Sequence, residues 1–105
     1  MSLRQFDVFA NPHPQSRSSR PYFVVLQSDL LAALETRIVA PLVGPSKIKH
    51  FERLMPEFVV SGKSFVLLPQ QLGAFPVRAV KRVVANLGSE RYRLIGALDL
   101  LFTGI

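Results

Sequence analysis

The N-terminal half of the chain carries short apolar segments divided by polar stretches, a pattern typical of β-strands. Residues 3–10 alternate, with Phe6 and Val8 on one side and Asp7 on the other, which predicts a half-buried first strand. Residues 22–26 are β-branched and apolar throughout, as in strands buried on both faces, and residues 37–42 form a similar segment. This half is therefore predicted to be a sheet.

The stretches between these strands are polar. Residues 11–21, NPHPQSRSSRP, combine proline, serine and arginine without large apolar side chains and predict a mobile, basic loop. Residues 27–35, QSDLLAALE, have room for about one turn of helix, in which the adjacent Leu30 and Leu31 do not easily both face one core. We therefore expect one of these leucines to be exposed for contact.

The middle of the chain contains a hairpin signal. Two apolar segments, EFVV and SFVLL, flank residues 61–63, SGK, and the glycine favours a tight antiparallel turn. Before them, the apolar residues of segment 47–58 are spaced as in a short helix that ends at Pro56: Ile48, Phe51, Leu54 and Met55.

The C-terminal part predicts the clearest helix. From Ser89, a candidate N-cap, one stripe holds the larger apolar side chains, Leu94, Ile95, Leu98, Leu101 and Phe102. Ala97 and Leu100 widen this stripe, so the helix needs more than one apolar partner surface, which a homodimer would supply. Gly96 inside the helix indicates a close approach, either to the same helix of a second copy or to the sheet of its own chain. The preceding residues 76–87 fit either a helix or a strand.

Composition narrows the class of protein. A chain of 105 residues with 49% hydrophobic content forms one domain, residues 1–105, with a core of its own. The absence of cysteine, of a long apolar segment and of a signal peptide predicts a cytoplasmic protein without membrane spans. A formal net charge of +6 favours a polyanionic partner, although a merely basic surface explains it equally well.

Candidate chemistry is sparse. His13 and His50 have no further ligands at metal-binding spacing, and the carboxylates form no acid–base pair, so we expect no metal, no cofactor and no enzyme activity. Nucleotide-binding motifs are absent too. A basic face for nucleic acid is conceivable from the spread of cations, but Phe51 and Phe65 beside it fit core positions better. Its candidate members are Lys47, Lys49, Arg53, Lys63, Arg78, Lys81 and Arg82.

Four motifs in a fixed order then identify a family resemblance. The motifs FVVLQSDLL, IVAPL, GAFPV and the final DLLFTGI span nearly the whole chain. In this order and at these separations they resemble the CcdB toxins of toxin–antitoxin modules. The resemblance implies a mainly β fold with α, namely an SH3-like barrel shared with MazF and Kid toxins, a long C-terminal helix and a homodimer. It also implies that residues 76–80, PVRAV, form a strand.

The resemblance implies a function as well. Such toxins bind the DNA gyrase A subunit and trap the gyrase–DNA cleavage complex. A CcdA-type antitoxin neutralises them, and operator DNA is reached only through the antitoxin complex. Two alternatives stay open: a MazF-like endoribonuclease of the same fold acting on RNA through the basic face, and a homologue that binds an antitoxin without being toxic.

Functional positions follow by matching the family's pattern. The positions that would contact gyrase are Leu30, Leu31, Asp99, Phe102, Thr103, Gly104 and Ile105. The family typically ends in Trp-Gly-Ile, so Thr103 is a departure that removes a large aromatic anchor. The arginines of the basic loop, Arg17 and Arg20, are expected to contact the acidic antitoxin. The residues themselves leave another interpretation open, in which the leucines and Phe102 are core side chains and Gly104 is a helix C-cap.

Overall fold

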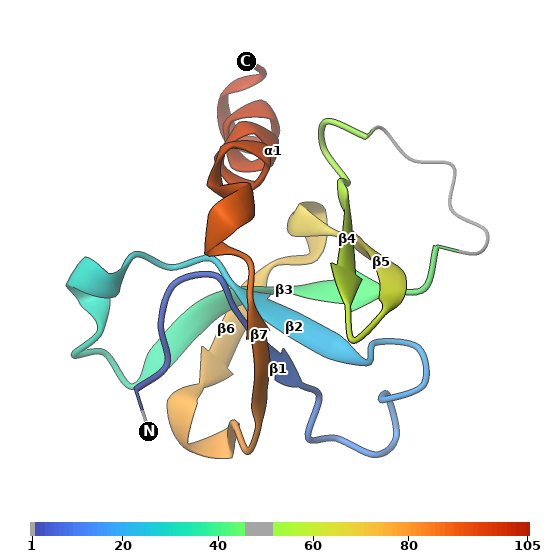
Figure 1. Cartoon of the computed structure of the whole chain (residues 1–105). Helices are drawn as coiled ribbons and strands as arrows, with labels where there is room; N and C mark the ends of the chain where they lie inside the picture. Colours follow the sequence, from blue (N-terminus) through green and yellow to red (C-terminus); the bar gives the residue numbers. More distant parts are fainter. Residues whose placement is uncertain (1, 46–51) are drawn as a thin grey trace.

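The computed structural model describes residues 2–45 and 52–105 (Figure 1). Within these residues there are seven strands, four short 3-10 helices and one α-helix. The strands are β1 Asp7–Ala10, β2 Tyr22–Val25, β3 Thr36–Val43, β4 Glu57–Val60, β5 Lys63–Leu67, β6 Gly73–Pro76 and β7 Val83–Asn86. The helices are η1 Asp29–Leu31, η2 Pro69–Gln71, η3 Val77–Ala79, η4 Gly88–Glu90 and α1 Arg91–Thr103.

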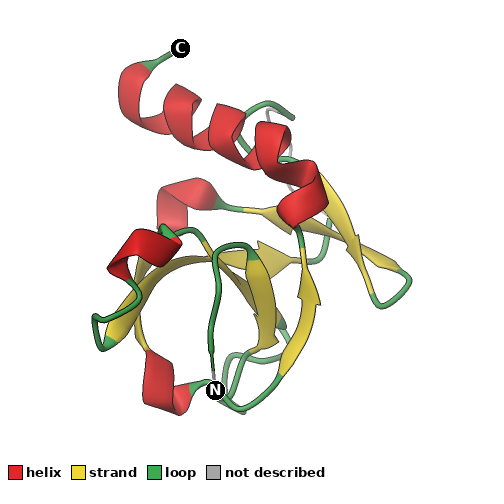
Figure 2. Ribbon diagram, turned by 60° about the vertical axis from the view of Figure 1, so that its left-hand side comes forward, coloured by secondary structure: helices red, strands yellow, loops and turns green. Residues whose placement is uncertain are grey.

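All the described strands belong to one antiparallel sheet. Its order is β4-β5-β3-β2-β1-β7, and β6 pairs with β3 beside β5. The sheet curls into a partly closed barrel, and α1 lies across one end of it (Figure 2). This arrangement confirms the predicted barrel-like, mainly β fold with a C-terminal helix.

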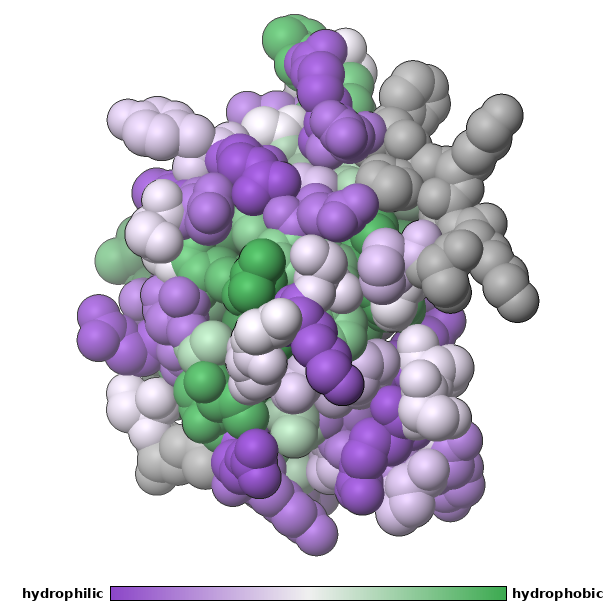
Figure 3. All heavy atoms as spheres, turned by 45° about the vertical axis from the view of Figure 1, so that its right-hand side comes forward, coloured by the Kyte–Doolittle hydropathy of each residue, from purple (hydrophilic) through white to green (hydrophobic). Residues whose placement is uncertain are grey.

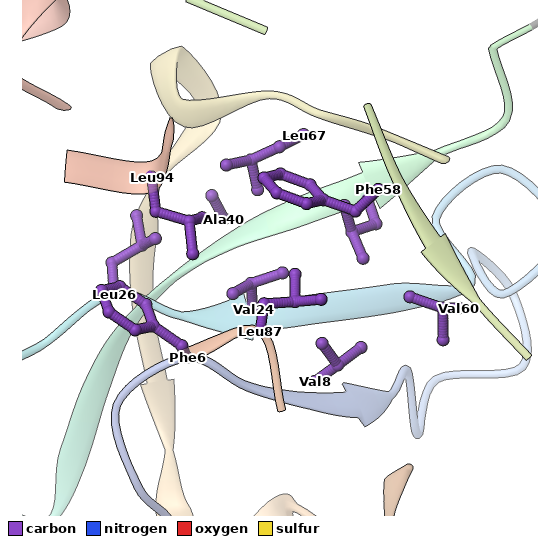
Figure 4. Packing of buried hydrophobic residues seen from close by; sticks show 11 residues of the cluster. Phe6, Val8, Val24, Leu26, Ala40, Phe58, Val60, Leu67, Leu87 and Leu94 are labelled. Atoms are coloured by element: carbon purple, nitrogen blue, oxygen red, sulfur yellow. The ribbon is translucent and has the colours of Figure 1, made fainter. Parts of the chain in front are cut away.

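Apolar side chains fill both sides of the curled sheet. The larger cluster lies between β1, β2, β3, the β4–β5 hairpin and α1, where Leu94 points toward Leu26 and Ala40 (Figure 4). A second cluster on the opposite side packs Phe9 and Phe75 with their ring centroids 5.0 Å apart. Since neighbouring residues of a strand face opposite sides, β1 and β2 both lie between two apolar layers.

Burial on both sides corrects one prediction and confirms another. The first strand is shorter than residues 3–10 and is not half-buried, because Val8, Phe9 and even Asp7 are buried. The carboxylate of Asp7 accepts hydrogen bonds from the backbone N–H of Arg4, at 2.8 Å, and from the side-chain amide of Asn86, at 2.9 Å. Segment 22–26 is buried on both faces at its end, as predicted.

The predicted hairpin is confirmed as β4 and β5. They pair antiparallel, with Val60 opposite Lys63. The two turn residues, Ser61 and Gly62, both have positive φ, 51° and 80°. This combination is the two-residue turn whose twist matches that of the flanking strands, which explains why a glycine is needed there.

Residues 76–80 do not form the expected strand. Pro76 ends β6, and the chain then makes the turn of η3, in which the N–H of Val80 donates to the carbonyl of Val77 at 3.0 Å. Ala79 and Val80 pack against the aromatic cluster from this turn. Val77 and Val80 therefore belong to a turn that packs on the core, and β7 begins only at Val83.

Two helix predictions also change. Ser89 does not cap α1, because residues 88–90 first form η4 and α1 begins at Arg91 without a side-chain cap. The helix predicted before Pro56 lies outside the described residues at 47–51, and residues 52–55 form turns and a bend instead.

Removing the buried carboxylate tests this account of β1. Asp7→Ala should lower the free energy of unfolding by about 1–3 kcal/mol, because two partly buried hydrogen bonds lose their acceptor. Urea denaturation followed by circular dichroism measures this loss. The exposed Glu52→Ala serves as the control and should change stability by less than about 0.5 kcal/mol. Equal midpoints for the two variants would contradict the account.

Candidate functional site

The helix α1 is held by its first half only. Leu94 and Ala97 are its fully buried side chains, and Ile95 and Leu98 pack against the same cluster while remaining partly exposed. Toward the C-terminus the helix projects beyond the barrel (Figure 1). Phe102 keeps 68% of its surface exposed and Ile105 keeps 82%, so these large apolar side chains face outward. They are not core residues.

The end of α1 is capped by its own residues. The Thr103 hydroxyl donates to the Asp99 carbonyl at 2.6 Å, and the Gly104 N–H donates to the Leu100 carbonyl at 3.0 Å. Gly104 has φ 75°, a left-handed conformation that favours glycine. The C-cap interpretation of Gly104 is thus confirmed. Beyond it, the Ile105 main-chain oxygen accepts a hydrogen bond from Arg53 Nη2 at 3.3 Å, while the Ile105 side chain stays exposed.

An apolar groove runs from the end of α1 to η1. Its volume is about 380 Å³, and it is lined by Leu26, Gln27, Ser28, Leu31, Ile38, Leu72, Leu98 and Phe102. The groove therefore brings Leu31 and Phe102 together although they lie far apart in the sequence. Hydrophobic side chains also lie at the tip of α1, at the top of Figure 3.

The local structure of η1 explains why both leucines are exposed. The Ser28 hydroxyl accepts a hydrogen bond from the Leu30 N–H at 3.1 Å, which starts the turn. Leu30 is 94% exposed and Leu31 is 50% exposed. We predicted that one of them would be exposed, and the structure exposes both. The interpretation of these two residues as core is wrong.

Gln27 is a site residue that the sequence analysis missed. Its amide nitrogen donates to the carbonyls of Leu31 and Thr36, and its amide oxygen accepts from the Ile38 N–H. These bonds tie η1 to the start of β3. No sequence signal marks this role, because the bonds form only once β2 and β3 are paired.

Asp99 and Gly96 lie on the exposed side of α1, away from the groove. The Asp99 side chain makes no hydrogen bond to the described residues and is not part of the groove lining. Gly96 is exposed, and a Cβ placed on it would meet no described atom within 4 Å. The expectation that Gly96 packs on its own sheet is therefore wrong, and the space beside it is open to an outside surface.

The two loop arginines are exposed but already bonded to neutral acceptors. Arg17 donates from Nε to the Asn11 carbonyl at 3.0 Å, and Arg20 donates from Nη2 to the side-chain oxygen of Gln71 at 2.5 Å. Asn11, only 1% exposed, organises the loop by donating to Ser16 and to the Arg20 carbonyl. Neither arginine forms an ion pair with a described carboxylate, so their positive charges stay available.

The described residues contain neither a cluster of metal ligands nor a membrane-spanning helix. Among residues 2–45 and 52–105, no group of three or more histidine, aspartate or glutamate side chains is placed to hold a metal ion. In the same part of the chain, no helix has the length and apolar character needed to cross a bilayer. The candidate site itself consists of the exposed apolar end of α1 and the groove beside it.

Comparison with known protein families matches residues 5–104 to the family described as CcdB protein. The chain belongs to the CcdB family. Membership supports the general assignment as a toxin of a toxin–antitoxin module, whose partners include an antitoxin and DNA gyrase. A comparison with curated proteins gave no match.

A pair of truncations on α1 should separate the tip from the core. Leu94→Ala should lower the free energy of unfolding by about 2–5 kcal/mol because it leaves a cavity, whereas Phe102→Ala should cost less than about 1 kcal/mol. Guanidinium denaturation of both variants measures the difference. A loss for Phe102→Ala as large as that for Leu94→Ala would mean that the tip is structural.

Proposed function

We propose that this CcdB family protein is a toxin that binds the DNA gyrase A subunit through the tip of α1 and η1 and traps the gyrase–DNA cleavage complex. The contact surface comprises Leu30, Leu31, Asp99, Phe102, Thr103, Gly104 and Ile105. A CcdA-type antitoxin neutralises the toxin. The protein acts as an inhibitor and needs no catalytic residue of its own.

The exposed apolar tip carries this proposal. Phe102 and Ile105 project from the barrel with most of their surface in water, and Leu30 and Leu31 extend the same apolar surface across the groove. Burying each such side chain in a partner is worth up to about 1.5–3 kcal/mol. A stable monomer gains nothing from exposing them, so a protein partner explains their position.

Thr103 lowers the expected affinity without removing the surface. Its side chain is exposed, but its hydroxyl bonds back to the helix and so offers a partner neither an aromatic ring nor a free donor. Large aromatic side chains often dominate the energy of an interface. Binding then depends more on Phe102 and Ile105 than in relatives that carry tryptophan at this position.

The same helix supports a homodimer. Leu100 and Leu101 remain partly exposed, and the open space beside Gly96 allows another backbone to approach. A second copy packed against this face would cover these side chains. It would also place two tips side by side, so that one toxin dimer could bind both halves of a symmetric target.

The antitoxin is proposed to bind through charge. The protein has a formal charge of +6, and the exposed Arg17 and Arg20 lie on a loop that Asn11 holds in shape. An acidic antitoxin segment would associate rapidly with such a surface at low salt. Operator DNA is then reached by the toxin as part of the antitoxin complex.

The dimer is tested by light scattering at micromolar concentration. We expect a mass of twice 11.7 kDa, because the partly exposed face of α1 needs a cover. Gly96→Leu should lower the dimer fraction by filling the open space, whereas Lys81→Ala, an exposed residue outside α1, should not. A monomer at both low and high concentration would contradict the dimer.

The gyrase contact is tested by trapping cleaved plasmid with purified gyrase. Deleting residues 103–105, or replacing Phe102 and Ile105 by alanine, should abolish the trapped linear DNA while the fold is retained. Tyr92→Ala is the matched control, since this aromatic residue on the same helix is 92% exposed but lies far from the tip. Thr103→Trp should raise the potency at least about tenfold by restoring an aromatic anchor.

Each outcome has one interpretation. Full trapping by the deletion variant would place the gyrase contact elsewhere. Cleavage of added RNA without gyrase would favour the MazF-like endoribonuclease. If the unchanged protein does not poison gyrase but the Thr103→Trp variant does, this chain has kept the binding surface and lost the toxicity.

A further inference from the structure

A second surface lies at the end of the barrel opposite α1. η3 and the segment that joins it to β7 carry three cations, Arg78, Lys81 and Arg82, which we name the basic ridge. In both ribbon views this segment and the β1–β2 loop occupy the lower end, while α1 occupies the upper end (Figures 1 and 2). The Arg82 carbonyl accepts the Ala10 N–H at 3.0 Å, which places the ridge directly beside the start of the basic loop.

The backbone of the ridge is held by packing and a hydrogen bond, while its charged side chains are unpaired within the described residues. Ala79 and Val80 pack into the aromatic cluster beneath it, and the bond from Ala10 holds the backbone of Arg82. The side chains of Arg78, Lys81 and Arg82 are exposed and form no hydrogen bond or ion pair with any residue in the described ranges. The folded chain therefore gives these cations no partner of its own.

The balance of charge at this end is strongly positive. The ridge itself carries three positive charges, and the loop that begins beside it carries Arg17 and Arg20. Glu35 lines a hollow together with Arg78, but no ion pair joins these two described side chains.

The chemistry around the ridge favours phosphate over a folded or peptide partner. Specific protein interfaces use buried aromatic anchors, yet the exposed large aromatic side chains of the described residues, Tyr92 and Phe102, both lie on α1. The exposed large apolar side chains next to Arg82 and Glu35 in the sequence are the aliphatic Val83 and Leu34. Ser18 and Ser19 are exposed on the basic loop, which begins beside the ridge, and the Ser19 hydroxyl donates to the Ser16 carbonyl at 3.1 Å. Arginine, lysine and serine are the side chains that most often contact the phosphates of DNA.

The same residues favour double-stranded over single-stranded nucleic acid. Binding of single strands uses exposed rings on which bases stack. The ring nearest the surface here, that of His13, is already packed against Phe75 with their centroids 5.9 Å apart. We infer that the basic ridge binds the phosphate backbone of duplex DNA, without reading the sequence, while the tip of α1 is occupied by its protein partner.

This contact goes beyond the proposed function. The ridge and the tip face opposite ends of the barrel, so both can be occupied at once. In a toxin bound to gyrase, the ridge would contact DNA next to the enzyme. In a toxin–antitoxin complex, the ridge would add its own phosphate contacts to those made by the antitoxin. The contact requires neither protein, so it can be measured with the toxin alone.

The test measures binding of the purified full chain to a fluorescent duplex by anisotropy, between about 50 and 200 mM salt. The double variant Lys81→Gln/Arg82→Gln is compared with Arg4→Gln/Lys63→Gln, which removes one lysine and one arginine elsewhere. Arg4 and Lys63 are exposed, and their side chains have no hydrogen bond to a described residue. The two variants therefore carry the same net charge.

We expect the ridge variant to weaken binding at least about tenfold at the lowest salt and to reduce the slope of log K against log salt by about 2, one unit for each lost phosphate contact. The control variant should keep the slope of the unchanged protein. Equal losses in both variants would overturn the proposal, since net charge alone would then explain binding.

Two further binding measurements distinguish duplex DNA from single-stranded DNA and from an acidic protein. Tighter binding to a single-stranded oligonucleotide than to the duplex would overturn the duplex assignment. A polyglutamate peptide whose binding depends on Lys81 and Arg82, with DNA binding unaffected by their loss, would assign the ridge to an acidic protein. Gyrase trapping by the ridge variant is scored separately, so failure of this proposal leaves the tip's role independently testable.

Discussion

The architecture depends on β3 pairing with three neighbours. One edge of β3 pairs with β2 along the full length of β2, while the other edge pairs first with β6, at residues 36–39, and then with β5, at residues 42–43. Pro41 lies next to this change of partner. Its carbonyl accepts the Leu68 N–H, and because the N and O of a strand residue point to the same side, its missing N–H faces the gap between β6 and β5.

This change of partner creates the seat for α1. Beyond Pro41 the β4–β5 hairpin turns away from β6, which opens the sheet above Ala40 and Leu67 and lets Leu94 enter between them (Figure 4). The link from β2 to β3, which contains η1, lies at the same opening. The leucines of η1 and the end of α1 therefore meet because both emerge where the sheet splits.

Much of the strand layout could be predicted from local pattern. The apolar segments 22–26 and 37–42 and the glycine of the hairpin turn correspond to β2, β3 and the β4–β5 turn, since these signals depend on neighbouring residues alone. Where a valine-rich segment turned out to be η3, Pro76 and the packing of Val80 on a distant aromatic cluster decided the outcome. Such a contact between distant residues leaves no local signature.

The members of the candidate site stay a prediction from family resemblance, and its geometry could not be predicted from the sequence. Family resemblance supplied the leucines of η1 and the end of α1. The groove between Leu31 and Phe102 and the anchoring by Gln27 require the paired strands. The burial of Asp7 was missed because its alternation with Phe6 and Val8 looked like one exposed face, whereas a second apolar layer covers that side.

The one-sided attachment of α1 makes the helix a lever arm. Leu94 and Ala97 form its pivot, and Ile105 lies 11 residues beyond Leu94 along the chain. At about 1.5 Å per residue, a tilt of about 10° at the pivot carries the final isoleucine through about 3 Å, nearly the width of a methyl group. Packing against the barrel thus sets the direction of the helix axis, while a partner bound at the C-terminus sets the final position of Ile105 within a few ångströms. Natural selection can retarget the end of such an arm without having to rebuild the barrel.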